Sequence, residues 1–597
     1  MVDYRPPMGD IRFVLTELAD LEGICELDAF PSADPDLVFS AFDEAARFAS
    51  EVVAPLNRVG DIQGSKLNDQ GEVTTPDGFK EAYSQYVAAG WGGVPFPSEY
   101  GGHGMPRIVG LVVQEMFKSA CLAFSLGPLL TIGAIEALLA HGTEEQRQLY
   151  LGKLISGEWM GTMNLTESHA GSDLGVINTK AIPADDGTYL ISGTKIFITW
   201  GEHDLTENIV HTVLAKLPNA PAGTKGISMF LVPKFLPGPD GGLGKRNDIH
   251  CVSIEHKLGI HASPTCVMSY GEEGGATGYL IGEENDGMRN MFTMMNAARI
   301  GVGQEGVALT ERAYQKALAF AQERRQGRAL GSTSPDNSFI IEHPDVRRML
   351  MTMKAYAEAM RALIYLAGAS VDLAHDHPDP RVREHNEEFL ALITPVCKAW
   401  CTDTGVEMTS VGLQVHGGMG YVEETGAAQF YRDSRITPIY EGTNGIQAVD
   451  LVGRKLGLRN GDVARDFLDR MAEAEVELSE VDGRFGDMSE ALTDAIDALR
   501  EATEWLIARS DHRDRLAGAS PYLKMLGLTA GGWLMARSAA AAARKLRRGD
   551  DGAGFLEAKI STAEFYTGQL LPEVRGLLPA VQGGADALFA IEPKYLG

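Results

Sequence analysis

The chain has 597 residues, of which 44% are hydrophobic and 22% are charged, and its formal net charge is −28. A chain of this length is too long for a single hydrophobic core, and its composition is that of an ordinary globular protein. The strong negative charge disfavours nucleic acid and an anionic membrane surface as partners, although it leaves room for a local basic pocket.

The N-terminal residues MVDYRPPMGDIRF lack the apolar segment and small-residue cleavage site of a secretory leader, so we expect none. No apolar run is expected to be long enough to span a bilayer. The six cysteines are sparse, and no Cys or His spacing is typical of zinc binding. We therefore predict a cytoplasmic protein with reduced core cysteines and no metal site.

Helical patterns dominate the first quarter of the chain. Residues 1–35 carry several prolines and are expected to form an irregular N-terminal extension. Apolar residues then recur at helical spacing in DPDLVFSAFDEAARFASEVVAPL, where Asp34 or Asp36 can cap the helix start. Similar patterns continue to EEQRQLYLGKLISG, which predicts an N-terminal helical domain over 36–158.

The pattern changes to strands near residue 159. TYLISGTKIFITWG, NIVHTVLAKL and KGISMFLVPKF are rich in β-branched and aromatic residues, and turn-forming residues separate them. They predict a central antiparallel β-barrel or sandwich over 159–285. Helical patterns then predict a C-terminal bundle over 286–455 and an additional helical domain over 461–597. This multidomain α and β order differs from the alternating order of a doubly wound sheet.

Two patterns that imitate functional motifs have simpler explanations. GVGQEG at 301–306 matches a dinucleotide-binding fingerprint, but that fingerprint needs a strand before it and a helix after it. Both flanks here are helical, so the glycines are expected to permit close helix packing. His375, His377 and His385 have no compact ligand spacing, and an inter-helix loop is favoured over a metal site.

Three stretches combine polar side chains with glycine in unusual settings. MNLTESHAGSDL at 163–174 offers hydroxyls, turn amides and Gly171, which suit a phosphate ligand, although an ordinary turn is an open alternative. KIFITWGEHD at 195–204 is strand-like and ends in polar residues. The third stretch, 413–447, contains ITPIYEGTNGIQ, where Glu441 lies beside apolar residues. Such carboxylates are usually paired or used, but Glu441 could also cap a helix that begins near Thr443.

Together these stretches resemble the acyl-CoA dehydrogenase family, whose motifs read T-E-x-x-A-G-S-D, W/F-I-T, Q-x-x-G-G-x-G and Y-E-G-T. The matching segments are 166–173, 197–199, 414–420 and 440–443, in order and at family spacing. The resemblance covers roughly 36–455. The added helices of 461–597, with HKLGIHASPTC and FITWGEHD, resemble a long-subunit branch. That branch includes 3-methylmercaptopropionyl-CoA dehydrogenases and some bacterial fatty acyl-CoA dehydrogenases.

The resemblance implies FAD-dependent dehydrogenation of an acyl-CoA thioester to a trans-2-enoyl-CoA. Glu441 would remove the pro-R α-proton while a hydride passes from the β-carbon to flavin N5. The backbone N–H of Glu441 and a flavin ribityl hydroxyl would polarise the carbonyl, and an apolar setting would strengthen the base. Some relatives carry the base on the helix containing NAAR, but that position is Ala298 here. Arg299 matches an arginine near the base, with helix packing as the open alternative.

The resemblance also assigns residues to FAD and implies at least a dimer, because a neighbouring subunit completes the site. The family pattern E-R-x-x-F-G is altered to ERRQGR at 323–328, so Arg324 lacks its aromatic neighbour. The residues expected around the flavin ring and pyrophosphate are Met163, Leu165, Thr166, Gly171 and Ser172. Phe197 and Thr199 are expected along the isoalloxazine, and Thr443 and Asn444 near the adenosine half. The neighbouring subunit is expected to contribute Gln414, Gly417, Gly418 and Arg324.

Two other functions are compatible with this fold. An acyl-CoA oxidase uses the same proton and hydride steps but passes the electrons to oxygen. A flavin-containing nucleic-acid-binding protein needs a basic face, which the net charge of −28 disfavours. The resemblance favours electron-transfer flavoprotein as the acceptor. The acyl group stays open between a fatty chain and 3-methylmercaptopropionyl.

Overall fold

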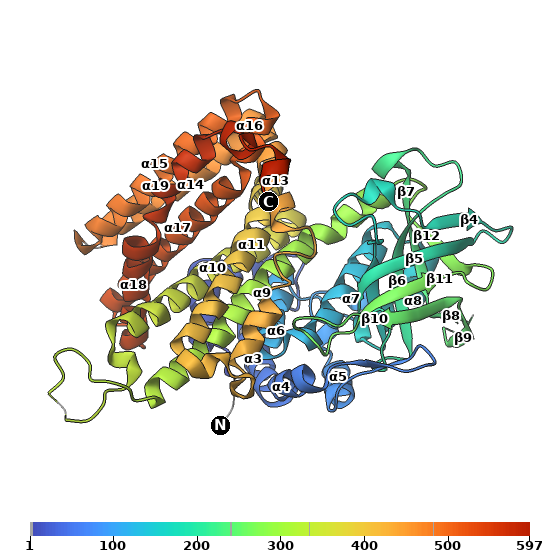
Figure 1. Cartoon of the computed structure of the whole chain (residues 1–597), viewed down its shortest axis with the longest axis horizontal. Coiled ribbons are helices and arrows are strands. Elements are labelled where there is room, and N and C mark those ends of the chain that lie inside the picture. Colours follow the sequence, from blue (N-terminus) through green and yellow to red (C-terminus); the bar gives the residue numbers. More distant parts are fainter. Residues whose placement is uncertain (1–3, 239–240, 334, 482) are drawn as a thin grey trace. The chain divides into compact units, whose positions relative to one another are not determined.

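The computed structural model describes residues 4–238, 241–333, 335–481 and 483–597. The chain forms two compact units, and Figure 1 shows their elements coloured along the sequence. Unit 1 consists of Glu44–Gly301 with the first five residues, and unit 2 consists of Pro6–Asp43 and Val302–Gly597. The predicted order of a helical segment, a strand-rich middle segment and two further helical segments is confirmed.

Unit 1 contains one large sheet with the strand order β10-β11-β5-β12-β7-β6-β3, and β4 pairs with β5 and β6. Most neighbours are antiparallel, as predicted, but β3 and β4 run parallel to β6. Two small hairpins pair β1 with β2 and β8 with β9. The strands are β1 (Lys66–Leu67), β2 (Val73–Thr74), β3 (Trp159–Asn164), β4 (Lys180–Pro183), β5 (Tyr189–Thr199), β6 (Asn208–Lys216), β7 (Ile227–Pro233), β8 (Phe235–Pro237), β9 (Leu243–Arg246), β10 (Ile249–Ile254), β11 (Thr265–Tyr270) and β12 (Ala276–Ile281).

The large sheet buries side chains on both faces. Along β7, Met229 and Leu231 pack in one hydrophobic cluster, whereas Phe230 and Val232 pack in another. This alternation follows from the two-residue period of a strand, which sends successive side chains to opposite faces. A strand with both faces covered reads as a continuous apolar run, as ISMFLVP does.

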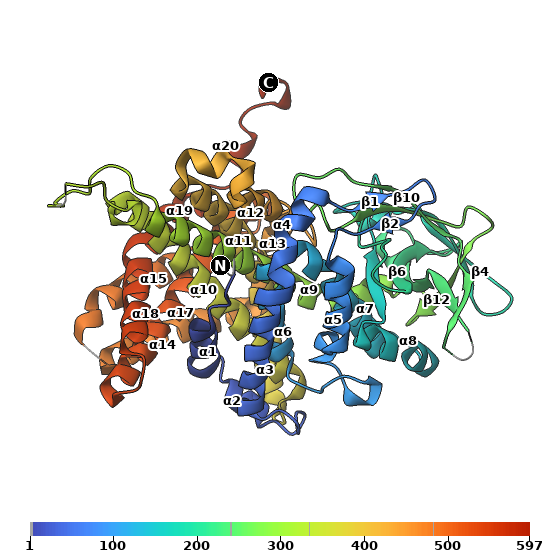
Figure 2. The ribbon, with the colours of Figure 1, turned by 90° about the horizontal axis from the view of Figure 1, so that it is seen from below.

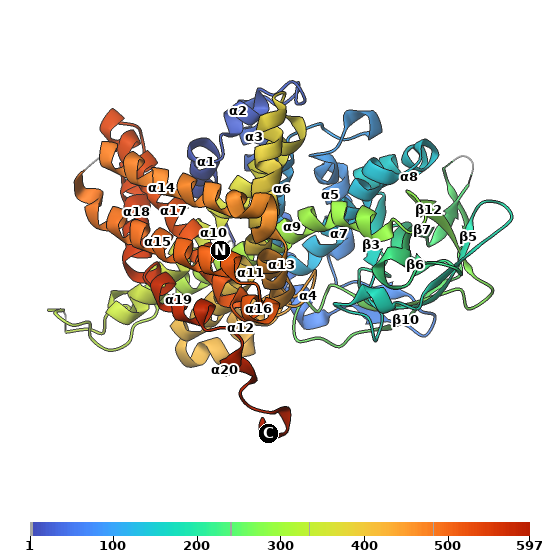
Figure 3. The ribbon, with the colours of Figure 1, turned by 90° about the horizontal axis from the view of Figure 1, so that it is seen from above.

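Helix α7 of unit 1 has a strongly apolar sequence, and most of it is buried inside the fold. In the described part of the chain, α7 alone has the length and composition to cross a membrane, and 72% of its most apolar window is buried within the fold. The expectation that no apolar run is long enough was therefore wrong. Figure 3 shows α7 close to β3. The helices are α4 (Ala54–Gln63), α5 (Phe79–Ala88), α6 (Arg107–Ala120), α7 (Leu122–His141) and α8 (Glu144–Ser156), while α3 (Pro35–Phe48) crosses the division between the units.

Unit 2 is helical. The long α17 packs against α10, α11, α14, α15, α18 and α19, and Figure 1 shows several of these helices side by side. The helices are α1 (Met8–Glu17), α2 (Leu21–Cys25), α9 (Gly287–Glu323, which begins in unit 1), α10 (Pro344–Asp376), α11 (Pro380–Val415), α12 (Ala427–Ser434), α13 (Asn444–Gly453), α14 (Asp462–Val481), α15 (Gly486–Ala508), α16 (His512–Ala517), α17 (Ala519–Arg548), α18 (Ala553–Phe565), α19 (Glu573–Gln582) and α20 (Asp586–Phe589).

The N-terminal extension is helical, so the expectation of an irregular segment was wrong. Pro7 immediately precedes α1, a position where proline does not interrupt the hydrogen bonds of the helix. Buried Asp10 on α1 accepts bonds from Arg361 of α10 at 2.6 Å and from Lys559 of α18 at 2.7 Å. These paired charges attach residues 6–43 to the C-terminal helices of unit 2 (Figure 2).

The GVGQEG sequence lies inside α9, as its helical flanks predicted. A Cβ atom at Gly303 would lie 2.3 Å from the Cys397 carbonyl oxygen, and one at Gly306 would lie 2.1 Å from that of Cys401. Because both distances are far below a real contact, the glycines allow α9 to approach α11 closely. The motif therefore serves helix packing.

Candidate active site

The loop that follows β3 in unit 1 contains four of the predicted flavin contacts, and Met163 lies in β3 just before it. Met163 is buried in the strand, whereas Leu165 and Thr166 are half-buried where the strand ends. Gly171 and Ser172 are exposed, and a Cβ atom at Gly171 would meet nothing within 4 Å. The fold itself does not require glycine there, so the open backbone is available to a ligand.

A buried ion pair anchors this loop to β5. The Lys195 ammonium donates to the Glu167 carboxylate at 2.9 Å and to the Leu165 carbonyl at 3.0 Å, and the Ile196 N–H donates to the Thr166 carbonyl at 3.0 Å. These bonds place Thr166 next to the residue that precedes Phe197. Two groups of predicted flavin contacts, about 30 residues apart in the sequence, are thereby brought together.

The electrostatics of the pair keep Glu167 ionised. Burial alone would raise the pKa of Glu167, but the Lys195 ammonium, the Thr179 hydroxyl and the Asn178 N–H lower it to about 2. Burial lowers the pKa of Lys195 to about 8, against the opposing effect of Glu167. The carboxylate accepts from the Thr179 hydroxyl at 2.6 Å and from the Asn178 N–H at 2.7 Å, which satisfies its remaining oxygen positions.

Phe197 occupies a strained position at the end of β5. The register between β5 and β11 shifts there, as in a β-bulge, and Phe197 has a φ of 60°. An aromatic residue rarely adopts this left-handed conformation, and a bulge redirects a side chain. Phe197 is 58% exposed, and Thr199 is half-buried two residues further on. The strand thus presents an aromatic surface beside the loop.

Glu441 lies in unit 2 on the loop between α12 and α13. The side chain is half-buried and the residue has a φ of 52°, followed by Gly442 at 84°. The capping alternative is not supported, because α13 begins at Asn444 and its N-cap residue, Thr443, makes no side-chain capping bond. An observed backbone outlier at a predicted catalytic residue is a sign of functional strain.

Helices α9 and α11 hold the Glu441 loop from two sides. The Tyr440 hydroxyl donates to the buried carboxylate of Glu305 on α9. Asn444 accepts from the Lys398 ammonium at 2.7 Å and donates to the Ala399 carbonyl at 3.1 Å, both on α11. Because the Asn444 amide is used within the chain, the predicted role near the adenosine falls to its backbone and to half-buried Thr443.

Four residues of this chain are predicted to bind the cofactor of a neighbouring subunit, and they lie near the adjoining ends of α9 and α11 in unit 2. Phe320 near the end of α9 and His416 after α11 have ring centroids 4.7 Å apart, which brings the two helix ends together. Exposed Arg324 and Gln414 lie at these ends. Exposed Gly417 and Gly418 follow, and Cβ atoms there would meet nothing within 4 Å. The cluster is therefore an open surface of glycine backbone, an arginine and an amide.

Arg299 lies on the part of α9 that belongs to unit 1, where it is 6% exposed. Nearby, the buried Lys118 ammonium donates to the Gly301 carbonyl at 2.8 Å. The role of Arg299 beside the base stays a prediction. Among the described residues, no three His, Cys, Asp or Glu side chains group as metal ligands, and all six cysteines are buried and without a disulfide.

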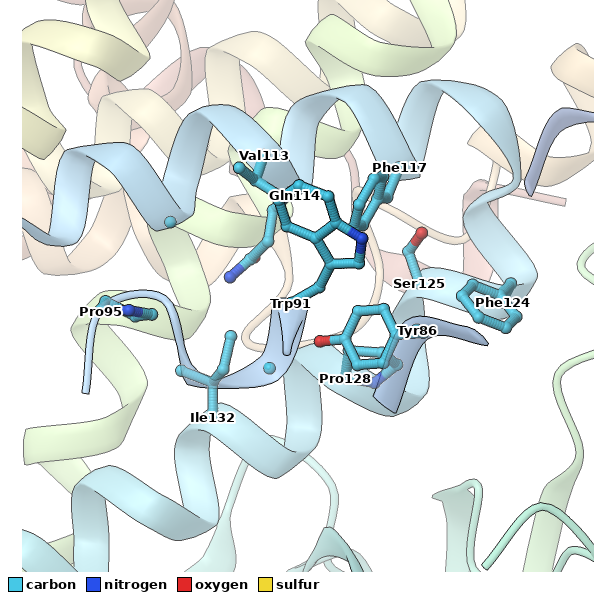
Figure 4. Close-up of a pocket in the computed structure, with 12 residues that line it drawn as sticks. Tyr86, Trp91, Pro95, Val113, Gln114, Phe117, Phe124, Ser125, Pro128 and Ile132 are labelled. Atoms are coloured by element: carbon cyan, nitrogen blue, oxygen red, sulfur yellow. The ribbon is translucent and has the colours of Figure 1, made fainter. Parts of the chain in front are cut away.

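A small cavity in unit 1 lies among α5, α6, α7 and the turn at Trp91. Figure 4 shows the Trp91 indole among Gln114, Phe117 and Tyr86, and its Nε1 has no hydrogen-bond partner within the described residues. The cavity volume is about 20 Å³, which is room for about one water molecule. An acyl chain does not fit in it as it stands, so the cavity is not assigned to the substrate.

Two residues that anchor the predicted site loops were not singled out for that role in the sequence analysis. Lys195 bonds the loop after β3 and Glu305 bonds Tyr440, yet neither residue belongs to the four segments that matched the acyl-CoA dehydrogenase motifs. Glu305 had a signal: a carboxylate among the glycines and apolar residues of GVGQEGVAL is unusual unless paired. Lys195 had none, because an alternating strand usually exposes its lysines.

Family models match the chain over nearly its whole length. "Acyl-CoA dehydrogenase, N-terminal domain" matches 41–158, the "middle domain" matches 162–271 and the "C-terminal domain" matches 285–456. A fourth model, "Acetyl-CoA dehydrogenase C-terminal like", matches 465–592. The chain therefore belongs to the acyl-CoA dehydrogenase family, and the resemblance carried by the four motifs is confirmed.

Among similar proteins is the 3-methylmercaptopropionyl-CoA dehydrogenase of Ruegeria pomeroyi, which is 47% identical over 98% of this chain and 99% of its own length. A butyryl-CoA dehydrogenase of Syntrophomonas wolfei is 36% identical over 97% of each chain. A solved acyl-CoA dehydrogenase of Bacillus anthracis, complexed with FAD, has a TM-score of 0.73 at 20% identity and covers 95% of this chain and 91% of its own. That likeness shows the fold.

Proposed function

We propose that the chain catalyses FAD-dependent dehydrogenation of an acyl-CoA thioester to a trans-2-enoyl-CoA. The observation that carries the proposal is Glu441, a half-buried carboxylate in a left-handed conformation on a loop anchored to two helices. Glu441 acts as the general base on the proton next to the thioester carbonyl. Arg299 supports the site. The relatives that match over nearly the whole chain are named 3-methylmercaptopropionyl-CoA dehydrogenase and butyryl-CoA dehydrogenase, which supports the proposal.

The described residues fit FAD. When bound, the cofactor supplies the acceptor for the substrate hydride. Phe197 offers an exposed aromatic side chain for stacking, and Gly171 in the loop after β3 leaves its backbone open. Thr166 after β3, Ser172 in the loop and Thr199 at the end of β5 provide hydroxyls, and Met163 and Leu165 complete the set. These residues bind and orient the flavin, and the anchored loop keeps their backbone in place.

We further propose a homodimer. On α9, Glu305 beside the Glu441 loop is 18 residues from the helix end at Glu323, which is about 27 Å at 1.5 Å per residue. On α11, Thr402 and Gln414 are 12 residues apart, or about 18 Å. The Arg324 and Gln414 cluster is thus distant from Glu441 of the same chain, which favours a role at a second subunit's cofactor.

Electron-transfer flavoprotein is the proposed acceptor, and the cytoplasm is the proposed location. The location is supported by six buried cysteines that form no disulfide. An oxidase would return the electrons to oxygen instead. The net charge of −28 argues against a nucleic-acid partner.

The visible spectrum of the purified protein tests the proposal. Butanoyl-, octanoyl-, palmitoyl- and 3-methylthiopropanoyl-CoA are added in turn without oxygen, and the fastest bleaching identifies the preferred acyl group. A protein that carries no flavin, or that none of the four bleaches, would contradict the proposed reaction. Peroxide release in air at the rate of turnover would favour the oxidase over the dehydrogenase.

A further inference from the structure

We propose that Glu305 is a positioning residue for the base: its carboxylate holds Tyr440 and thereby keeps the neighbouring Glu441 in its strained, reactive conformation. The inference rests on the proposed function and extends it to a residue outside the matched motifs. It starts from the backbone of the loop. Glu441 has a φ of 52°, and a left-handed conformation of a non-glycine residue is unfavourable unless the surroundings enforce it.

The surroundings enforce it through anchors on either side of Glu441. On its N-terminal side, the Tyr440 hydroxyl donates to Glu305 on α9. On its C-terminal side, the Asn444 side chain bonds Lys398 and Ala399 on α11, and the Asn444 N–H donates to the Pro438 carbonyl at 3.0 Å. Glu441 and Gly442 therefore form a short arc whose two ends are fixed to different helices.

Glu305 is placed to hold its end of the arc. Its side chain is fully buried on α9, one residue before Gly306, which brings α9 close to α11. The two helices that carry the anchors are therefore held at a fixed distance. A buried carboxylate is unfavourable without partners, and a phenol is a strong neutral donor for it. Burial and Glu305 raise the pKa of Tyr440 well above its usual range, so the phenol remains a donor at physiological pH.

Loss of this bond would release only one end of the arc. Asn444 would still hold the loop on α11, so the chain is expected to stay folded while Glu441 samples other backbone conformations. A base misplaced by about 1 Å can slow a reaction about 100-fold. Substrate affinity should change little, because Tyr440 uses its hydroxyl inside the protein. The predicted signature is a lower kcat at an unchanged KM.

Four variants test the proposal: Tyr440→Phe, Glu305→Ala, Glu305→Gln and, as a matched control, Tyr431→Phe, which removes a half-buried phenol hydroxyl from α12. Each is purified with its flavin, and the anaerobic bleaching rate is measured against acyl-CoA concentration. Tyr440→Phe and Glu305→Ala should bleach about 10–100-fold more slowly at saturation with KM unchanged. Glu305→Gln keeps an acceptor oxygen and should stay within about 3-fold of wild type, as should the control.

Wild-type bleaching rates in Tyr440→Phe and Glu305→Ala would overturn the inference while leaving the proposed function intact. Glu305→Gln as slow as Glu305→Ala would also overturn it, because the charge rather than the hydrogen bond would then be responsible. If Glu305→Ala fails to fold, Tyr440→Phe decides alone, since it removes a single oxygen. A wild type that no acyl-CoA bleaches would overturn both the inference and the proposed function.

Discussion

The two loops that carry the predicted chemistry are built differently. In unit 1, the loop beside Phe197 is pinned by a buried ion pair, Glu167 with Lys195. In unit 2, the Glu441 loop is pinned through hydrogen bonds of Tyr440 and Asn444 to two helices. A non-glycine residue with a left-handed backbone lies beside the first loop, Phe197 on β5 at a φ of 60°, and another lies within the second loop, Glu441 at 52°.

This comparison separates two kinds of residue within each motif. Phe197 and Glu441, which are expected to meet ligands, are exposed and half-buried respectively, and both have a left-handed backbone. Their neighbours, such as Glu167, have buried side chains whose polar atoms are used inside the chain. A motif therefore records both the reactive residue and its support, and only the folded structure distinguishes them.

The largest effect on stability is expected when the ion pair between Glu167 and Lys195 is broken. Lys195→Met leaves the buried Glu167 carboxylate without its partner and should destabilise unit 1 by about 3–5 kcal/mol, with loss of FAD. Thermal unfolding and the flavin absorbance of the purified variant report both changes. Lys180→Met, at an exposed position on neighbouring β4, is the control and should match the wild type. An unchanged melting temperature in Lys195→Met would refute the anchoring role.

The next effect is a pH dependence from the same pair. The pKa of Glu167 is lowered from 4.5 to about 2 in the folded chain, so its contribution to stability is complete above about pH 4.5 and is lost as the pH falls towards 2. Acid unfolding should be steeper in the wild type than in Glu167→Gln between these pH values. If stability fell with pH equally in the wild type and in Glu167→Gln, folding would not lower the pKa of the Glu167 carboxylate.

A glycine that packs against another helix and a glycine whose backbone is open to a ligand should respond differently when each is replaced by alanine. Gly306→Ala forces a Cβ atom to within 2.1 Å of the Cys401 carbonyl oxygen and should destabilise unit 2 by about 1–3 kcal/mol. Gly418→Ala adds its Cβ atom to open space, so the melting temperature of the FAD-free protein should not change, while FAD is bound more weakly. Differential scanning calorimetry and fluorescence titration of FAD measure the two effects. A destabilised Gly418→Ala with normal FAD affinity would reverse the assignment.

The smallest effect tests the strain at Phe197. Phe197→Gly removes an exposed ring and permits the φ of 60° without strain, so the FAD-free protein should gain about 1 kcal/mol of stability. FAD affinity should fall, because the aromatic surface is lost. Denaturant unfolding of the FAD-free variant gives the first quantity, and a binding titration gives the second. Lower stability in the FAD-free variant would mean that the conformation is not strained.

The sequence predicted the large elements because their signals are local. Helical periodicity identified the helix of DPDLVFSAFDEAARF, and Asp34 caps it by accepting from the Leu37 N–H at 3.1 Å. The extension was misjudged because prolines were taken as breakers, although buried Ile11 and Val14 stabilise α1 through tertiary packing. Parallel pairing of β3 with β6 was also beyond local patterns.

The motifs predicted Glu441 as the base and 163–174 as a flavin-binding loop, but they did not predict the residues that anchor these loops. Tyr440 and Glu305 are 135 positions apart, and Lys195 and Glu167 are 28 apart. Such contacts depend on how helices and strands pack, which a single sequence does not reveal. Asn444 illustrates the same limit, since its amide bonds α11 rather than remaining available to a ligand.

The central claim is that Glu441 is the base, and the anaerobic bleaching rate of Glu441→Gln tests it most directly. The variant keeps the shape of the side chain and should retain its yellow flavin and its affinity for acyl-CoA. Without a base, bleaching by the preferred acyl-CoA should be slower by about 10²–10⁴-fold. A flavin-loaded Glu441→Gln protein that is bleached at the wild-type rate would contradict the account.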